Sequence, residues 1–157
     1  MKTSEFLAQS IEKKHEQVFA LARTVPVERL DWAPGGQSRS VLDQLQELGI
    51  IIRFYVAMLR EKTAPEPTPE MFEEYQTDRK KLTTIDECEA SAKSHTDELA
   101  ALIRAYSDED LEKRILLPFM GGMDLSMADL MMMVYWNLSY HEGQIQFILN
   151  ILAEPAS

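Results

Sequence analysis

The last long segment of the chain, from about residue 126 to residue 152, is almost free of charge. Between Leu130 and Leu152 the only certain charge is that of Glu142. Its apolar residues recur at helical spacing, and the helix they predict is about 38 Å long at 1.5 Å per residue. A helix with so few charges has to be covered on nearly every side. The segment therefore predicts the central helix of a bundle, an interface between copies of the chain, or both.

Three earlier segments also repeat apolar residues three and four positions apart, which is the period of an α-helix. The first spans about 4–24 and ends before Pro26, and the second spans about 39–62. The third spans about 84–106 and opens with the capping box Thr84-Ile85-Asp86-Glu87. No segment shows a convincing strand alternation. Four helices predict an all-α bundle.

Two of the three connections between these helices carry further signals. Residues 63–70 read TAPEPTPE, and three prolines within five residues cannot continue a helix. Thr68 followed by Pro69 predicts a short helix over about 70–76. The sequence ILLPFMGGMDL predicts an irregular or hairpin-like crossover with Gly121-Gly122 at its tip. Because no second core follows either connection, residues 1–157 are expected to form a single domain.

The charge balance excludes several classes of partner. The chain has 26 acidic and 16 basic residues, one cysteine and a net charge of −10. Such a charge argues against binding to a nucleic-acid backbone or to anionic lipid. The amino-terminal residues lack the apolar stretch of a secretory signal, and one cysteine fits a reducing compartment. We therefore expect a cytoplasmic protein with no nucleic-acid or membrane partner.

Polar residues on apolar helix faces mark the candidate site. Asn137, His141 and Gln144 follow one another at spacings of four and three, so they share one face of the last helix. Gln46 lies on the apolar stripe of the second helix, and Glu47 is turned about 100° away from it. Facing helices of a bundle can bring such side chains into one cavity. His141 is the candidate general base, although no carboxylate is obvious as its partner unless Glu47 reaches it.

The other two histidines and the cysteine have alternative interpretations. His15 and His95 fit the stripes of the first and third helices, and with His141 they would form a metal triad if all three lay at one depth. A lone histidine on such a stripe is more often a hydrogen-bonded core residue. Cys88 stands near a helix start, where a thiol pKa can be lowered, but we favour a buried small apolar residue.

Several short motifs occur in a recognisable order. They are Trp32-x-Pro34, then Ser40-Val41 at the start of the second helix, then His141-x-Gly143-Gln144 in the last helix. Together with the crossover before the last helix, they resemble the DinB/YfiT-like superfamily of four-helix-bundle metalloenzymes over nearly the whole chain. The resemblance implies an up-down-down-up-like bundle with a long connection between helices two and three.

Family members that bind a metal use one histidine on helix two, six residues after the Ser or Thr, and an HxxxH pair on the last helix. The resemblance places Gln46, Asn137 and His141 at these positions. Amide oxygens are weak neutral ligands, whereas Zn and Ni sites prefer imidazole, thiolate or carboxylate. We therefore expect no metal and a ligand site formed by Gln46, Asn137, His141 and Gln144. Zn or Ni held by Gln46, Asn137 and His141 is the alternative.

Three functions stay open at this point, and whether the protein is an enzyme stays open with them. The first is binding of a small molecule in the bundle pocket without a metal. The second, which the resemblance implies, is a divalent-metal-dependent transferase or hydrolase that acts with a thiol cofactor. The third is a non-catalytic interaction module. A homodimer is expected because the family often pairs through its helices and because the last helix is nearly uncharged.

Overall fold

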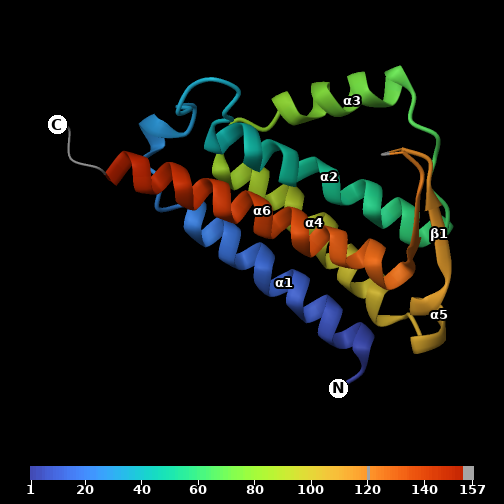
Figure 1. Cartoon of the computed structure of the whole chain (residues 1–157). Helices are drawn as coiled ribbons and strands as arrows, with labels where there is room; N and C mark the ends of the chain where they lie inside the picture. Colours follow the sequence, from blue (N-terminus) through green and yellow to red (C-terminus); the bar gives the residue numbers. More distant parts are fainter. Residues whose placement is uncertain (120, 154–157) are drawn as a thin grey trace.

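Four long helices form the body of the molecule in the computed structural model, which describes residues 1–119 and 121–153. They are α1 (Thr3–Ala22), α2 (Val41–Glu61), α4 (Ile85–Arg104) and α6 (Met127–Ala153), and they pack side by side along their lengths (Figure 1). The predicted all-α four-helix bundle is confirmed. No helix within these described ranges is long and apolar enough to cross a membrane.

The direction of the helices is up-down-down-up. α1 and α6 run one way, while α2 and α4 run the other way (Figure 1). Because α2 and α4 follow each other and point in the same direction, the chain has to return along the bundle between them. A further helix, α3 (Pro69–Lys80), makes this return along the outer side of α2. The predicted long connection is thus confirmed, and its helix is longer than the expected residues 70–76.

Side-chain caps explain where the helices begin. The Ser40 hydroxyl accepts a hydrogen bond of 3.1 Å from the Asp43 amide and so caps α2. Thr68 caps α3 in the same way, with proline at the first helical position. Thr84 and Glu87 form the predicted capping box of α4. Each of these caps joins residues three positions apart, so the local sequence is enough to define where the helix begins.

The crossover before α6 is a β-hairpin. It follows the short helix α5 (Asp108–Glu112) and consists of β1 (Arg114–Leu117) and β2 (Met123–Ser126), which are antiparallel. Gly121 and Gly122, with φ of 81° and 79°, occupy left-handed conformations at the tip, as the glycine pair predicted. Ile115 and Leu117 are buried against the bundle, so the hairpin covers one end of the core.

Gly49 lies against the start of α4 and the residue Leu82 just before it. A Cβ atom at Gly49 would lie 2.5 Å from Cδ1 of Leu82 and 3.4 Å from the carbonyl oxygen of Cys88. The Ser91 hydroxyl donates a 2.6 Å hydrogen bond to the Gly49 carbonyl. A glycine in the middle of a helix costs about 1 kcal/mol relative to alanine, and here it makes room for the neighbouring segment.

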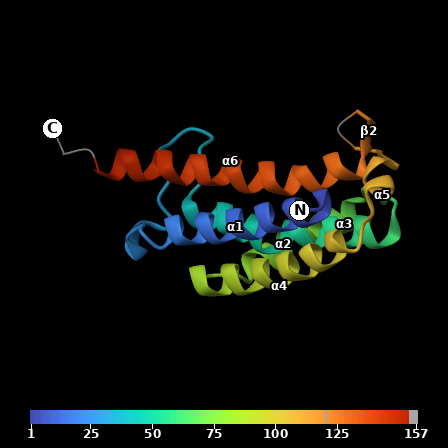
Figure 2. The same ribbon diagram turned by 90° about the horizontal axis from the view of Figure 1, so that it is seen from below.

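The last helix, α6, is covered on one side only. Of the positions predicted for it, the one at the centre of the bundle is wrong. Leu130, Leu138 and Ile145 are fully buried, whereas Trp136, Tyr140 and Phe147 are 59–61% exposed. Figure 2 shows α6 in an outer layer, opposite α4, with α1 and α2 between them. The helix therefore is not central to the bundle. Its low charge reflects an aromatic outer face in addition to its buried face.

Candidate functional site

His141 lies at the contact between α6 and α2, and its side chain is fully buried. Its Nδ1 atom is 3.0 Å from Oε1 of Gln44, and its Nε2 atom is 3.2 Å from Oε1 of Glu47. Residues 44 and 47 are three apart on α2, so they lie on one face of that helix. The imidazole ring is therefore held from two sides by neighbouring side chains of a single helix.

Both ring nitrogens of His141 face acceptor oxygens. The imidazolium form, which carries a hydrogen on each nitrogen, donates to both of them. Asn137, one helical turn before His141, directs its Nδ2 atom towards the same Glu47 oxygen at 3.5 Å. Two of the predicted residues thus converge on the Glu47 carboxylate.

Arg39 completes the polar cluster from the start of α2. Its Nη1 atom donates to Oε2 of Glu47 at 2.6 Å, and its Nε atom is hydrogen-bonded to Asp43. Burial favours the neutral form of Glu47, but the hydrogen bond and charge of His141, aided by Arg39, outweigh it and lower the pKa of Glu47 to about 2. Glu47 is consequently a carboxylate at neutral pH.

Gln46, the expected helix-two member of the site, points elsewhere. Its Nε2 atom donates a 2.8 Å hydrogen bond to the carbonyl oxygen of Leu82, just before α4. Successive residues of a helix are turned by about 100°, so a helix that presents Gln44 and Glu47 to His141 directs Gln46 to another neighbour. The site takes its α2 residues from positions 44 and 47 instead.

The sequence contains a signal that could have identified Glu47 as a member of the cluster. Glu47 is the only acidic residue between Asp43 and Glu61, and it stands among the apolar residues of α2. A lone carboxylate in such a position needs a charged or hydrogen-bonding partner, because an unpaired buried charge is costly. Gln44 gives no comparable signal, since an amide is ordinary near a helix start.

Gln144 lies beside Gln44 in a pocket of about 250 Å³. The pocket lies between the start of α2 and α6, and Arg39, Tyr140 and Phe147 also line it. The Nε2 atom of Gln44 is buried and has no hydrogen-bond partner among the described residues. Gln44 therefore connects the pocket to His141 through its oxygen and still has a free donor.

The other two histidines do not join His141. The Nδ1 atom of His15 is 3.5 Å from the Thr96 hydroxyl, between α1 and α4, and burial lowers the pKa of His15. His95 is on α4 as well, whereas His141 is held between α6 and α2. Among the residues that the structure describes, no three His, Cys, Asp or Glu side chains are placed to hold a metal. The alternative triad is therefore not formed.

The donors around Glu47 do not fit a Zn or Ni ion. They comprise one imidazole between two acceptor oxygens, one amide, and one carboxylate whose second oxygen is bound by Arg39. A divalent cation on Glu47 would lie against the Arg39 guanidinium, and only one imidazole is present. The cluster instead offers amide and guanidinium donors, together with a histidine–carboxylate contact next to Gln44.

Comparison with known structures shows which proteins share this fold. YfiT from Bacillus subtilis, described as a probable metal-dependent hydrolase with an unusual four-helix bundle topology, is similar with a TM-score of 0.80 and 13% identity, over 97% of this chain and 89% of that one. The DNA-bound colibactin self-resistance protein ClbS is similar with a TM-score of 0.67 and 13% identity, over 96% and 97%.

A third similar structure is the mycothiol-dependent maleylpyruvate isomerase, with a TM-score of 0.64 and 14% identity, over 90% of this chain and 60% of the isomerase. At these identities the likeness shows a shared fold. No curated protein matches the chain. The model of the DinB superfamily matches residues 10–145, which is most of the chain. The chain belongs to the DinB superfamily.

Proposed function

We propose that the protein binds a small uncharged molecule in the pocket beside Gln44, without a metal. The observation that carries this proposal is the buried, unpartnered Nε2 atom of Gln44. A buried donor without a partner costs about 1–3 kcal/mol, so an acceptor oxygen of a ligand would remove a real penalty. A carbonyl oxygen is the simplest group that satisfies it.

The rest of the pocket narrows the class of ligand. Arg39 lines the pocket, but Asp43 and Glu47 already neutralise its guanidinium. The pocket therefore offers no unpaired charge to bind an ion. Tyr140 and Phe147 supply aromatic walls, and a cavity of about 250 Å³ admits a molecule of roughly one ring. We expect a carbonyl group attached to a flat apolar body.

His141 and Glu47 act as positioning residues in this proposal. His141 donates from Nδ1 to Oε1 of Gln44, which leaves the Nε2 end of the amide without a protein acceptor. Glu47 holds the imidazole from its opposite side at 3.2 Å. The pair thereby fixes the orientation of an amide that would otherwise be free to flip.

Benzamide, which combines a carbonyl oxygen with one aromatic ring, is a suitable probe. We expect saturable changes in the aromatic-ring NMR signals of Tyr140 and Phe147, which line the pocket, at millimolar benzamide. Gln44→Glu keeps an oxygen for His141 and removes the donor, so it should abolish the response. Gln46→Glu makes the same chemical change outside the pocket and should leave the response intact. A response that does not saturate, or that persists in Gln44→Glu, contradicts the proposal.

Metal-dependent catalysis with a thiol cofactor remains the second candidate function. It is favoured by the relatives, since YfiT is described as a probable metal-dependent hydrolase and the isomerase as mycothiol-dependent. The donor set at Glu47 argues against it for this chain. Metal analysis of the purified protein separates the two candidates, because near-stoichiometric Zn or Ni would support the second one.

The outer face of α6 supports a homodimer, as part of the same proposal. Trp136, Tyr140 and Phe147 lie along one side of the helix and are 59–61% exposed, with Gly143 between them. A chain of net charge −10 meets a second copy most easily through an uncharged surface.

The same charge supports a cytoplasmic protein that does not bind DNA, although the relative ClbS is seen with double-stranded DNA.

A further inference from the structure

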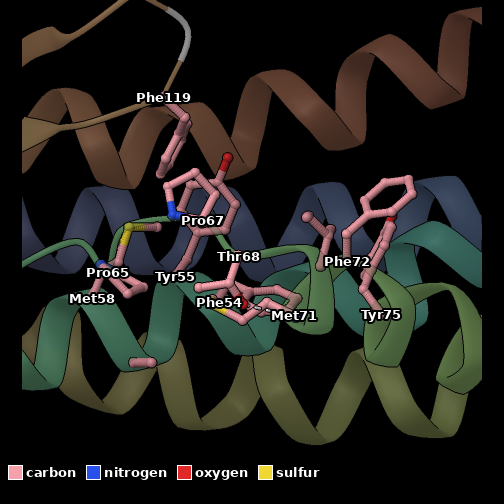
Figure 3. A pocket seen from close by; sticks show the side chains of 12 residues that line it. Phe54, Tyr55, Met58, Pro65, Pro67, Thr68, Met71, Phe72, Tyr75 and Phe119 are labelled. Atoms are coloured by element: carbon pink, nitrogen blue, oxygen red, sulfur yellow. Dashed lines mark hydrogen bonds between the residues drawn. The ribbon is translucent and has the colours of Figure 1, made fainter.

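A second and larger pocket lies between α2 and the segment that returns along it. Its volume is about 380 Å³, within the range of small-molecule sites. Figure 3 shows Phe119, Tyr55 and Pro67 at one end and Phe72 and Tyr75 at the other. Among the described residues, no charged side chain lines it. This pocket differs from the Gln44 pocket in composition and shares no lining residue with it.

The way α3 is attached explains why a cavity is present. Ion pairs bind the end of α3 to α2, with 2.7 Å between Asp78 and Arg53 and 2.7 Å between Arg79 and Asp43. The beginning of α3 has no comparable ion pair to α2 in the described chain, and the prolines before it cannot donate backbone hydrogen bonds. The start of the helix is therefore tied to α2 less closely than its end, and apolar side chains of both segments line the pocket between them.

We propose that this pocket binds an uncharged aromatic molecule. Aromatic rings prefer to pack against other rings in offset or edge-on contacts, and Phe54, Tyr55, Phe72, Tyr75 and Phe119 supply such partners. Phe54 and Tyr75 already form an edge-on pair, with centroids 6.0 Å apart. Phe72 is 62% exposed without a ligand, so a bound ring would cover apolar surface that now faces water.

Charge around the pocket selects against anions. Residues 63–76, which form its outer wall, contain four glutamates and no lysine or arginine. The nearby guanidinium of Arg53 is paired with Asp78, and that of Arg79 is paired with Asp43. An anionic ligand would therefore meet repulsion without compensation. None of these glutamates lines the pocket, so a cation would lose its hydration there without gaining a carboxylate partner, and an uncharged ligand is the best match.

Two fluorescent probes with the same aromatic skeleton test both parts of the proposal. N-phenyl-1-naphthylamine is uncharged, and 8-anilino-1-naphthalenesulfonate differs from it by one sulfonate. We expect the uncharged probe to bind with one-to-one stoichiometry and at least about tenfold more tightly than the sulfonate. Equal affinity for the two probes, or no saturable binding of the uncharged one, would overturn the proposal.

Matched variants locate the bound probe. Phe72→Ser removes an aromatic wall from an exposed position on α3, and burial of a phenylalanine is worth enough to predict a loss of about tenfold in affinity. Phe6→Ser is the control, because Phe6 is similarly exposed at 57%, lies on α1 and lines neither pocket. Gln44→Glu should leave the affinity unchanged. If Phe72→Ser binds the probe as the wild type does, or if Phe6→Ser loses as much affinity as Phe72→Ser, the pocket is not the binding site.

Discussion

The Nε2 atom of His141 lies 3.2 Å from Oε1 of Glu47, with the two side chains 1% and 17% exposed. This contact joins the last helix to the second helix across the bundle. A hydrogen-bonded pair that is largely removed from water is costly to break, because the Glu47 carboxylate is then left buried without this partner. Substitution of either residue, or a change in pH, should therefore alter the measured stability of the folded protein.

Stability should fall in acid through Glu47. The folded-state pKa of Glu47 is about 2 against an ordinary 4.5. A lowered carboxylate pKa stabilises the folded state above the unfolded pKa, and this contribution disappears as pH falls from about 4.5 to 2. The difference corresponds to about 3 kcal/mol, to order of magnitude. Urea unfolding across this range should show a shallower pH dependence for Glu47→Gln than for wild type.

The control for this measurement is Glu73→Gln, which removes an exposed carboxylate on α3. It should retain the wild-type pH dependence. Identical slopes for wild type and Glu47→Gln would show that Glu47 does not keep its charge through the contact with His141.

A metal site should be obtainable by changing two residues. Glu47→His with Asn137→His would place three imidazoles around the present position of the Glu47 carboxylate, and three imidazoles are a competent Zn set. We expect Zn binding by calorimetry with near-unit stoichiometry. Gln46→His with Asn137→His is the control and should bind at least about a hundredfold more weakly, because Gln46 faces Leu82. Tighter binding by the control pair would mean that position 46 of α2, and not position 47, faces Asn137 and His141.

Gln44 and Gln46 should differ in their effect on stability. Gln44→Leu leaves Nδ1 of the buried His141 without its acceptor, so we expect a loss of about 1–3 kcal/mol. Gln46→Leu breaks one hydrogen bond to Leu82 in a half-buried place and should cost at most about 1 kcal/mol. Urea unfolding of both variants at pH 7 measures the comparison. Equal losses of stability, or a larger loss for Gln46→Leu, would contradict this prediction.

Cys88 should be unreactive in the folded protein. Its side chain is fully buried, and burial raises the pKa of its thiol to about 12. The effect of burial outweighs its position near the start of α4, so the thiolate is scarce at pH 8. We expect Ellman's reagent to react at least about a hundredfold faster in denaturing guanidinium than in buffer. Rapid labelling in buffer would indicate that the start of α4 opens readily.

The oligomeric state tests the aromatic face of α6. Light scattering at micromolar concentration should give about twice the chain mass of 18.0 kDa. Trp136→Glu adds a charge to that face and should shift the protein towards the monomer, whereas Phe6→Glu on α1 should not. A wild-type monomer at this concentration would contradict the proposed dimer.

The helices could be predicted from the sequence because their signals are local. Thr84 and Glu87, for example, form a capping box whose two partners are three residues apart, and the structure contains it. The covering of α6 could not be predicted in the same way. A low charge indicates that a helix avoids water, but whether a neighbouring helix or a second copy covers Trp136 depends on contacts between distant segments.

The mutual placement of the candidate residues was predictable on α6 and less so on α2. Asn137, His141 and Gln144 share a face at any helix rotation, since only their mutual spacing matters. Choosing between Gln46 and its neighbour Glu47 requires the absolute rotation of α2 about its axis. A shift of one residue changes that direction by about 100°, which no pattern within a single helix can decide.

The parallel course of α2 and α4 has a consequence for how this protein can change over evolution. The return segment between them travels the length of the molecule, yet residues 63–78 are exposed or only partly buried, so they add little to the bundle core. Substitutions there can reshape the outer wall of the pocket between α2 and this segment while the four long helices keep their packing. The outer wall of the pocket and the bundle core thus lie in separate stretches of the chain, and selection can act on that wall without disturbing the core.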